Sequence, residues 1–102
     1  MARFDIYVNP AKAARHVLYV DVQSDFVDLG TRWCLPLLRH FSGWPMIQGV
    51  QARVVVDSIE FLMDTPSVLA VPLVILRKRA GRLSASEQLD AESCIDFMLR
   101  GY

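Results

Sequence analysis

Three features of the sequence predict a mainly β fold with one α-helix near the end of the chain. Apolar and polar residues alternate from Leu18 to Gln23, which is the period of a half-buried strand. Val68 to Leu76 is a continuous apolar run that is rich in β-branched residues and contains Pro72, which favours a strand over a helix. Ser84 followed by Glu87 is a capping box, which starts a helix.

The first half of the chain is expected to hold three strands. Residues 4–8 alternate and form the first strand, which ends at Asn9-Pro10. The second strand covers residues 18–23, and turn-forming residues follow it. Residues 32–35 return as a third strand. We expect it to stop at Pro36, because proline donates no hydrogen bond to a β-ladder.

The second half is expected to hold a hairpin, a long strand and the helix. Residues 52–56 and 59–63 pair around Asp57-Ser58, a two-residue turn. After a turn at residues 64–67, the apolar strand 68–76 should carry Pro72 at a bulge or an edge, and the basic residues 77–79 form its solvated end. The helix is expected to run from Ser84 to about Leu99, with Gly101 as its left-handed end. Its apolar seam consists of Gln88, Ala91, Ile95 and Met98, flanked by Cys94 and Phe97.

Length, composition and charge restrict the class of protein. A chain of 102 residues is expected to be a single domain, residues 1–102. Its apolar content of 53% exceeds the usual level of about 45–50%, which favours burial of some surface in a homodimer. The 11 basic and 11 acidic residues balance, which argues against a nucleic-acid partner. With no signal peptide and no apolar run near 18 residues, we expect no membrane contact and a cytoplasmic location.

The residues that most often carry catalysis or bind metals form no recognisable motif. Cys34 and Cys94 lie far apart without matching histidines, so we expect buried, unpaired thiols rather than a metal site. No motif sets a nucleophile beside His40, which favours a surface histidine, and Trp44 is either a partner anchor or a cap on the core. No catalytic residue, metal or cofactor is predicted.

The apolar pair Phe26-Val27 stands on the connection between the second and third strands. Such residues are either tucked beneath a loop or offered to a partner. They follow the six residues Val20 to Asp25, VDVQSD, and precede Asp28, a short Gly-containing turn, Arg32 and an apolar strand ending in Pro-Leu. This stretch resembles the CcdB family, the toxins of plasmid and chromosomal toxin–antitoxin modules that poison DNA gyrase. The Val-Pro pair at residues 71–72 is a second likeness.

The resemblance implies a fold, a target and partners. The fold would be a small antiparallel SH3-like barrel or sheet of about five strands, with a small extra sheet and one C-terminal helix. The protein would be a homodimer whose two C-terminal tails enter the opened gyrase A-subunit dimer and trap the enzyme on cleaved DNA. A cognate CcdA-like antitoxin would wrap the toxin with a disordered segment and free gyrase. No cofactor is implied.

The resemblance also assigns contact residues. The tail of the family carries a tryptophan where this chain has Arg100, so a rigid aromatic contact is exchanged for a charged side chain that still stacks on planar groups. The implied gyrase contacts are Phe26 and Val27 in the loop and Leu99, Arg100, Gly101 and Tyr102 in the tail, and the implied antitoxin contacts are Lys12 and Arg15.

Two alternatives remain open at the level of sequence. The first is a dimeric binding module that keeps the fold and the antitoxin contact but has lost or changed its gyrase target, for which Arg100 is the support. The second is a MazF-like endoribonuclease, because such nucleases share this fold and a fold alone does not define a function. The neutral charge and the lack of an acid–base constellation argue against a nuclease.

Overall fold

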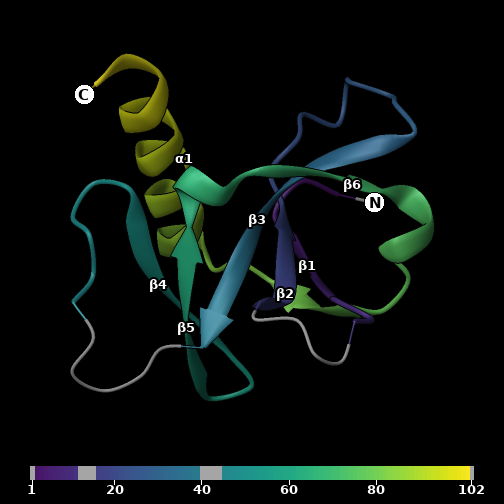
Figure 1. Ribbon diagram of the computed structural model, residues 1–102, viewed down its shortest axis with the longest axis horizontal. Helices are drawn as coiled ribbons and strands as arrows, with labels where there is room; N and C mark the ends of the chain where they lie inside the picture. The colour runs from purple at the N-terminus through teal and green to yellow at the C-terminus, as the bar shows by residue number, and fades with distance from the viewer. Residues whose placement is uncertain (1, 12–15, 40–44, 102) are drawn as a thin grey trace.

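The computed structural model describes residues 2–11, 16–39 and 45–101, which form a curled antiparallel sheet with one long helix beside it (Figure 1). The helix lies alongside the β-hairpin of residues 51–64 (Figure 1). The elements are β1 (Asp5–Val8), β2 (His16–Asp21), β3 (Thr31–Arg39), β4 (Gln51–Val56), β5 (Ile59–Asp64), the short 3-10 turn η1 (Thr65–Ser67), β6 (Leu69–Pro72), a second 3-10 turn η2 (Leu73–Ile75), β7 (Arg79–Arg82) and α1 (Ala85–Arg100).

The strand order β4-β5-β3-β2-β1-β7 confirms the predicted fold class of a mainly β protein with one C-terminal helix. Within the described residues, seven strands share a single sheet, where the resemblance implied about five strands and a small extra sheet. The long strand β3 is the reason. One of its edges pairs with β2, while the other pairs with β6 over its first half and with β5 over its second half. The small extra sheet expected from the family is therefore joined to the main sheet through β3.

The expectation that the third strand stops at Pro36 is wrong, because β3 continues through this proline. On the edge away from β2, the partner of β3 is β6 as far as Cys34 and β5 from Leu37 onwards. The Trp33 carbonyl accepts a hydrogen bond from Val22, so it faces the β2 side of the strand. Backbone alternation then turns the Pro36 nitrogen toward the gap between β6 and β5, where a missing N–H removes no ladder hydrogen bond.

The expectation of one long strand over residues 68–76 is also wrong, because β6 ends at Pro72 and η2 follows. Within the described residues β6 pairs with β3 alone, so the predicted edge position of Pro72 is confirmed. Arg79 is not merely a solvated strand end, since it begins β7, a strand that the sequence analysis did not predict. The Asp5 carboxylate joins β1 to β7, with Arg79 Nε and Arg82 Nη1 each 3.2 Å from its Oδ1 atom.

The main core lies between the inner face of the sheet and α1. Ala91 and Cys94 are the fully enclosed residues of the helix, while Met98, expected on the same seam, is 46% exposed. The hairpin expected around Asp57-Ser58 is confirmed. Both residues have positive φ, 50° and 65°, as the tight turn between two antiparallel strands requires. The buried cluster draws on nearly every strand and includes Phe4, Ile6, Leu18, Val20, Val22, Leu35, Leu37, Val54, Phe61, Met63 and Leu83.

The two ends of α1 are as predicted. The Ser84 hydroxyl accepts a hydrogen bond from the Glu87 N–H, and Glu87 Oε1 accepts one from the Ser84 N–H. The other carboxylate oxygen of Glu87 accepts a hydrogen bond from the Val55 N–H of β4 at 2.9 Å. Gly101 ends the helix in the left-handed conformation, with φ of 82°. The capping box therefore both starts the helix and fixes it to the sheet.

We expect Ser84→Ala to lower the free energy of unfolding by about 1 kcal/mol, because the first turn loses its cap. Urea unfolding of the purified protein measures this. The matched control is Ser93→Ala, the same exchange at an exposed position inside α1, which should be neutral or slightly stabilising because alanine is the better helix former. Equal losses in the two variants would contradict a capping role.

Candidate functional site

The loop between β2 and β3 presents apolar side chains to solvent. Phe26 is 100% exposed and Val27 is 42% exposed, so the pair is offered outward rather than tucked beneath the loop. The turn itself is ordered by short-range hydrogen bonds, from the Phe26 N–H to Ser24 Oγ and from the Val27 N–H to the Ser24 carbonyl. An ordered loop with a fully exposed phenylalanine is the kind of feature that marks a contact surface.

A buried ion pair supports this loop from below. Arg32 Nε lies 2.8 Å from Asp21 Oδ2, and the two residues are 7% and 0% exposed. The same guanidinium reaches up into the loop, where Nη2 donates to the Gln23 carbonyl at 3.0 Å and to Asp25 Oδ1 at 3.1 Å. A single arginine on β3 therefore holds the last residue of β2 and two residues of the loop.

Gln23 closes the loop on itself. Its side-chain amide donates to the Val27 carbonyl, and its side-chain oxygen accepts from the Trp33 N–H, both at 2.9 Å. The Asp21 carboxylate in turn accepts from the Gln23 N–H at 3.1 Å. The buried side chains of Asp21 and Gln23 thus face inward, and with Arg32 they form the frame that supports Phe26 and Val27.

Burial and pairing act against each other in this network. Burial raises the pKa of Asp21, and the hydrogen bonds from Arg32 and from the Gln23 N–H offset part of that rise. Desolvation opposes the charge on Arg32, but the Asp21 and Asp25 carboxylates outweigh it, and the Arg32 pKa is raised. Burial also raises the pKa of Cys34 to about 12, so this thiol stays protonated at neutral pH. Both cysteines are buried and unpaired, as expected.

Arg3 joins the loop to the helix. Its N–H donates to Asp25 Oδ1 and its Nε donates to the Val22 carbonyl, both at 3.0 Å. Its Nη1 lies 3.6 Å from Glu92 Oε1 on α1, and its guanidinium carbon lies 4.5 Å from the centre of the Phe4 ring. Arg3 could not be predicted as a site residue from the sequence, because nothing in the local pattern around it indicates contacts with residues so far along the chain.

A second exposed apolar feature lies at the end of α1. Four partly exposed side chains, Trp33, Val68, Met98 and Leu99, surround a cavity of about 190 Å³, which we call the apolar groove. Arg3 and Val22 also line this groove, so it adjoins the base of the Phe26 loop. Residues from the two ends of the chain are therefore neighbours, and Trp33 joins the residues that the sequence analysis did not identify.

The predicted contact residues fall into three groups. Phe26 and Val27 are exposed on the loop. In the helix end, Leu99 is 73% exposed and lines the apolar groove, Arg100 is exposed as the last helical residue, and Gly101 is the left-handed end. The remaining predicted residues, Lys12, Arg15, His40, Trp44 and Tyr102, lie outside the described part of the chain.

The described residues hold no group of three or more side chains that could bind a metal ion. Over the same ranges, no helix combines the length and the apolar character that crossing a membrane requires. The geometry instead shows apolar side chains held outward on a hydrogen-bonded frame, a feature that is typical of protein contact surfaces.

Comparison with known families gives a match over nearly the whole chain. A family model described as CcdB protein matches residues 3–101, essentially the whole chain. The chain therefore belongs to the CcdB family. Membership supports, in general terms, the role of a toxin in a toxin–antitoxin pair that poisons gyrase. No curated protein matches the chain.

We expect Arg32→Met to lower the free energy of unfolding by about 3–5 kcal/mol, because it leaves the Asp21 carboxylate buried without its partner. Arg53→Met is the matched control. Arg53 makes a long, exposed ion pair with Glu60, at 3.4 Å, and its loss should cost no more than about 1 kcal/mol.

Urea unfolding of both variants measures the two costs. A loss below about 1 kcal/mol for Arg32→Met would mean that the buried pair is not the support of the loop.

Proposed function

We propose that this protein is a toxin that binds the A subunit of DNA gyrase and holds the enzyme on cleaved DNA. The observation that carries the proposal is the fully exposed Phe26, mounted on a loop whose frame is buried and hydrogen-bonded. A hydrophobic anchor that is already ordered loses little conformational entropy on binding. The full match to the CcdB family supports gyrase as the target.

The proposed contact surface combines the loop with the end of α1. Phe26 and Val27 supply the apolar anchors from one side, and Leu99 with the exposed Arg100 supplies the other. Arg3 contacts the loop through Asp25 and the helix through Glu92, so one residue lies against both halves of the proposed surface. Gly101 and Tyr102 complete the proposed set of contacts.

Arg100 sets the strength of the proposed gyrase contact. A tryptophan at this position would add a large rigid apolar surface, which is the type of residue that dominates interface energies. Arginine offers a planar group that stacks, but it is charged and flexible. We infer that gyrase binding is weaker here than in a family member with tryptophan at this position.

We propose a homodimer, with the apolar groove as the contact between copies. Trp33 is 56% exposed and stands beside Met98 and Leu99, so the face is too apolar to suit permanent exposure to water. Pairing two such faces would bring the ends of both α1 helices together. The proposed gyrase contacts of the two copies would then lie side by side.

The remaining parts of the proposed function concern the antitoxin and the compartment. We propose that a CcdA-like antitoxin neutralises the protein, with Lys12 and Arg15 as contacts, and that the protein acts in the bacterial cytoplasm, where gyrase works.

The retargeted binding module is the second candidate. Arg100 in place of the family tryptophan is the specific observation that favours it.

We expect Phe26→Ala to weaken gyrase A-subunit binding and Arg100→Trp to strengthen it, each by roughly thirtyfold. Truncating or adding a hot-spot aromatic changes the binding free energy by ~2 kcal/mol or more, and each ~1.4 kcal/mol is a factor of ten. Calorimetry with the purified A subunit measures the affinities. Ile59→Ala is the matched control, because Ile59 is an exposed apolar residue at the β4–β5 turn.

Three results would separate the candidates. Loss of binding in Phe26→Ala but not in Ile59→Ala supports the gyrase poison. Unchanged binding in both Phe26→Ala and Arg100→Trp moves the gyrase site elsewhere. If neither the parent protein nor Arg100→Trp binds gyrase while an antitoxin peptide still binds, the retargeted module is the better description.

We expect Trp33→Glu to convert the homodimer into a monomer, because the change introduces a charge at the centre of the proposed contact. Sedimentation equilibrium at micromolar concentration measures the mass. Ile59→Glu is the control, since Ile59 has a similar exposure, 51%, outside the groove. A parent protein that sediments as a monomer would contradict the dimer itself.

A further inference from the structure

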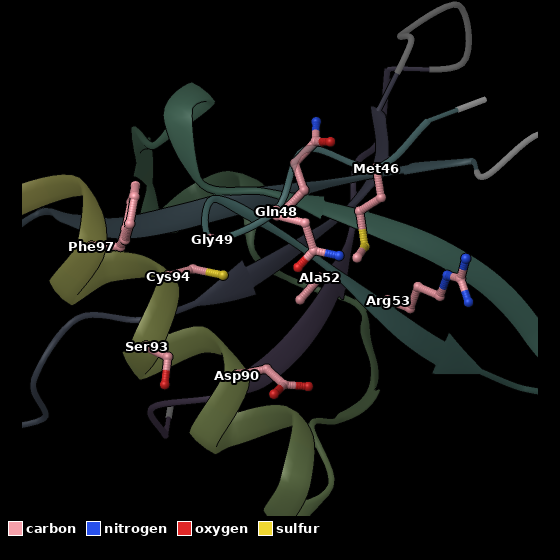
Figure 2. Close-up of a pocket in the computed structure, with 10 residues that line it drawn as sticks. Met46, Gln48, Gly49, Ala52, Arg53, Asp90, Ser93, Cys94 and Phe97 are labelled. Carbon is pink, nitrogen blue, oxygen red and sulfur yellow. The ribbon is translucent and has the colours of Figure 1, made fainter. Parts of the chain in front are cut away.

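A second hollow lies between α1 and the start of β4, and it shares no lining residue with the apolar groove. Figure 2 shows Asp90, Cys94 and Phe97 on the helix and Ala52 and Arg53 on the neighbouring strand, with the Cys94 thiol pointing toward Ala52. The hollow encloses about 390 Å³, and we call it the β4 groove. A volume of this size lies within the range of about 300–1,000 Å³ that is usual for ligand sites.

The β4 groove runs along an edge of the sheet that no other described strand covers. β4 stands at the end of the strand order and pairs with β5 on its other side. The Gln51 N–H donates to the Ile47 carbonyl at 3.1 Å, and the Val55 N–H donates to the Glu87 carboxylate at 2.9 Å, so both point away from β5. Because backbone direction alternates along a strand, the N–H and carbonyl of Arg53, midway between them, point the same way.

The free edge is closed at both ends and open in the middle. Proteins normally blunt an exposed strand edge, because unpaired N–H and carbonyl groups invite another strand to pair with it. Here the Ile47 carbonyl and the Glu87 carboxylate accept the N–H groups of Gln51 and Val55, at the two ends of the edge. Among the described residues, the Arg53 N–H has no acceptor. The opening therefore spans about one backbone pair, which suits a short segment and not a long strand.

The walls of the groove indicate what such a segment should carry. Ala52, Cys94 and Phe97 make an apolar floor, and Phe97 is 44% exposed. The Asp90 carboxylate on the helix wall has no ion-pair partner in the described part of the chain. The guanidinium of Arg53, the cation among the lining residues, is already paired with Glu60. A ligand with one apolar and one basic side chain would therefore complement the lining of the groove.

We propose that the β4 groove binds a short extended peptide segment of a partner protein by strand addition at Arg53. The segment would exchange backbone hydrogen bonds with Arg53, lay an apolar side chain on the floor near Phe97, and set a lysine or arginine against Asp90. Backbone hydrogen bonds supply affinity in this mode of recognition, and the side-chain pockets supply selectivity. This site is separate from the proposed gyrase contact and does not depend on it.

The test uses a panel of short acetylated peptides that carry a valine and a lysine two residues apart, so that both side chains face α1 when the segment pairs with β4. The peptides are titrated into the parent protein, and binding is followed by backbone NMR. The expected result is binding that slows hydrogen exchange of the Arg53 N–H. Asp90→Asn should weaken binding by about threefold, as expected for loss of one exposed ion pair. Asp96→Asn should have no effect, because Asp96 is an exposed acid of the same helix that does not line the groove.

Matched peptides identify the mode of binding. Replacing lysine by glutamate should weaken binding by more than the threefold effect of Asp90→Asn, because it sets two like charges together. N-methylation of the residue between valine and lysine, which removes the backbone donor opposite Arg53, should abolish binding. If no peptide of the panel binds, or if the N-methylated peptide binds as tightly, strand addition is refuted. If the peptides bind but exchange of the Arg53 N–H is unchanged, or if Asp96→Asn weakens binding as much as Asp90→Asn, the groove is not the site.

Discussion

The buried contact between Asp21 and Arg32 is the interaction on which the candidate site depends. Two opposite charges are removed from water at the junction of β2 and β3, and each is acceptable there only because the other is present. The remaining donors of Arg32 are satisfied by the backbone and carboxylate of the loop. The ion pair that must be satisfied in the core thereby also holds the apolar loop at the surface in one conformation.

That fixed shape has consequences beyond the loop. Arg3 donates hydrogen bonds to the Asp25 carboxylate and the Val22 carbonyl, and it forms an ion pair with Glu92 on the helix. Arg3 therefore contacts both the loop that carries Phe26 and the middle of α1, although most of the chain separates them in sequence.

The helix serves two surfaces at once. Its final turns contribute Met98 and Leu99 to the apolar groove, and its earlier turns contribute Asp90 and Cys94 to the β4 groove. The capping box fixes the starting point of the helix and also closes the end of the β4 edge through Glu87. One short polar motif thus sets the position of the helix relative to both surfaces.

The sequence by itself determined the alternating strand at Leu18, the β4–β5 turn, the capping box and the left-handed Gly101, because local backbone preferences govern all four. It also marked Phe26 and Val27 as candidates, since apolar residues on a loop need an explanation. Only the tertiary structure decided the course of β3 through Pro36, the breaking of the run after Pro72 and the existence of β7. Those outcomes depend on which strand lies opposite each residue. The ties of Arg3 and the position of Trp33 beside Leu99 follow the same rule, because they join segments far apart in the chain and no local pattern records such distances.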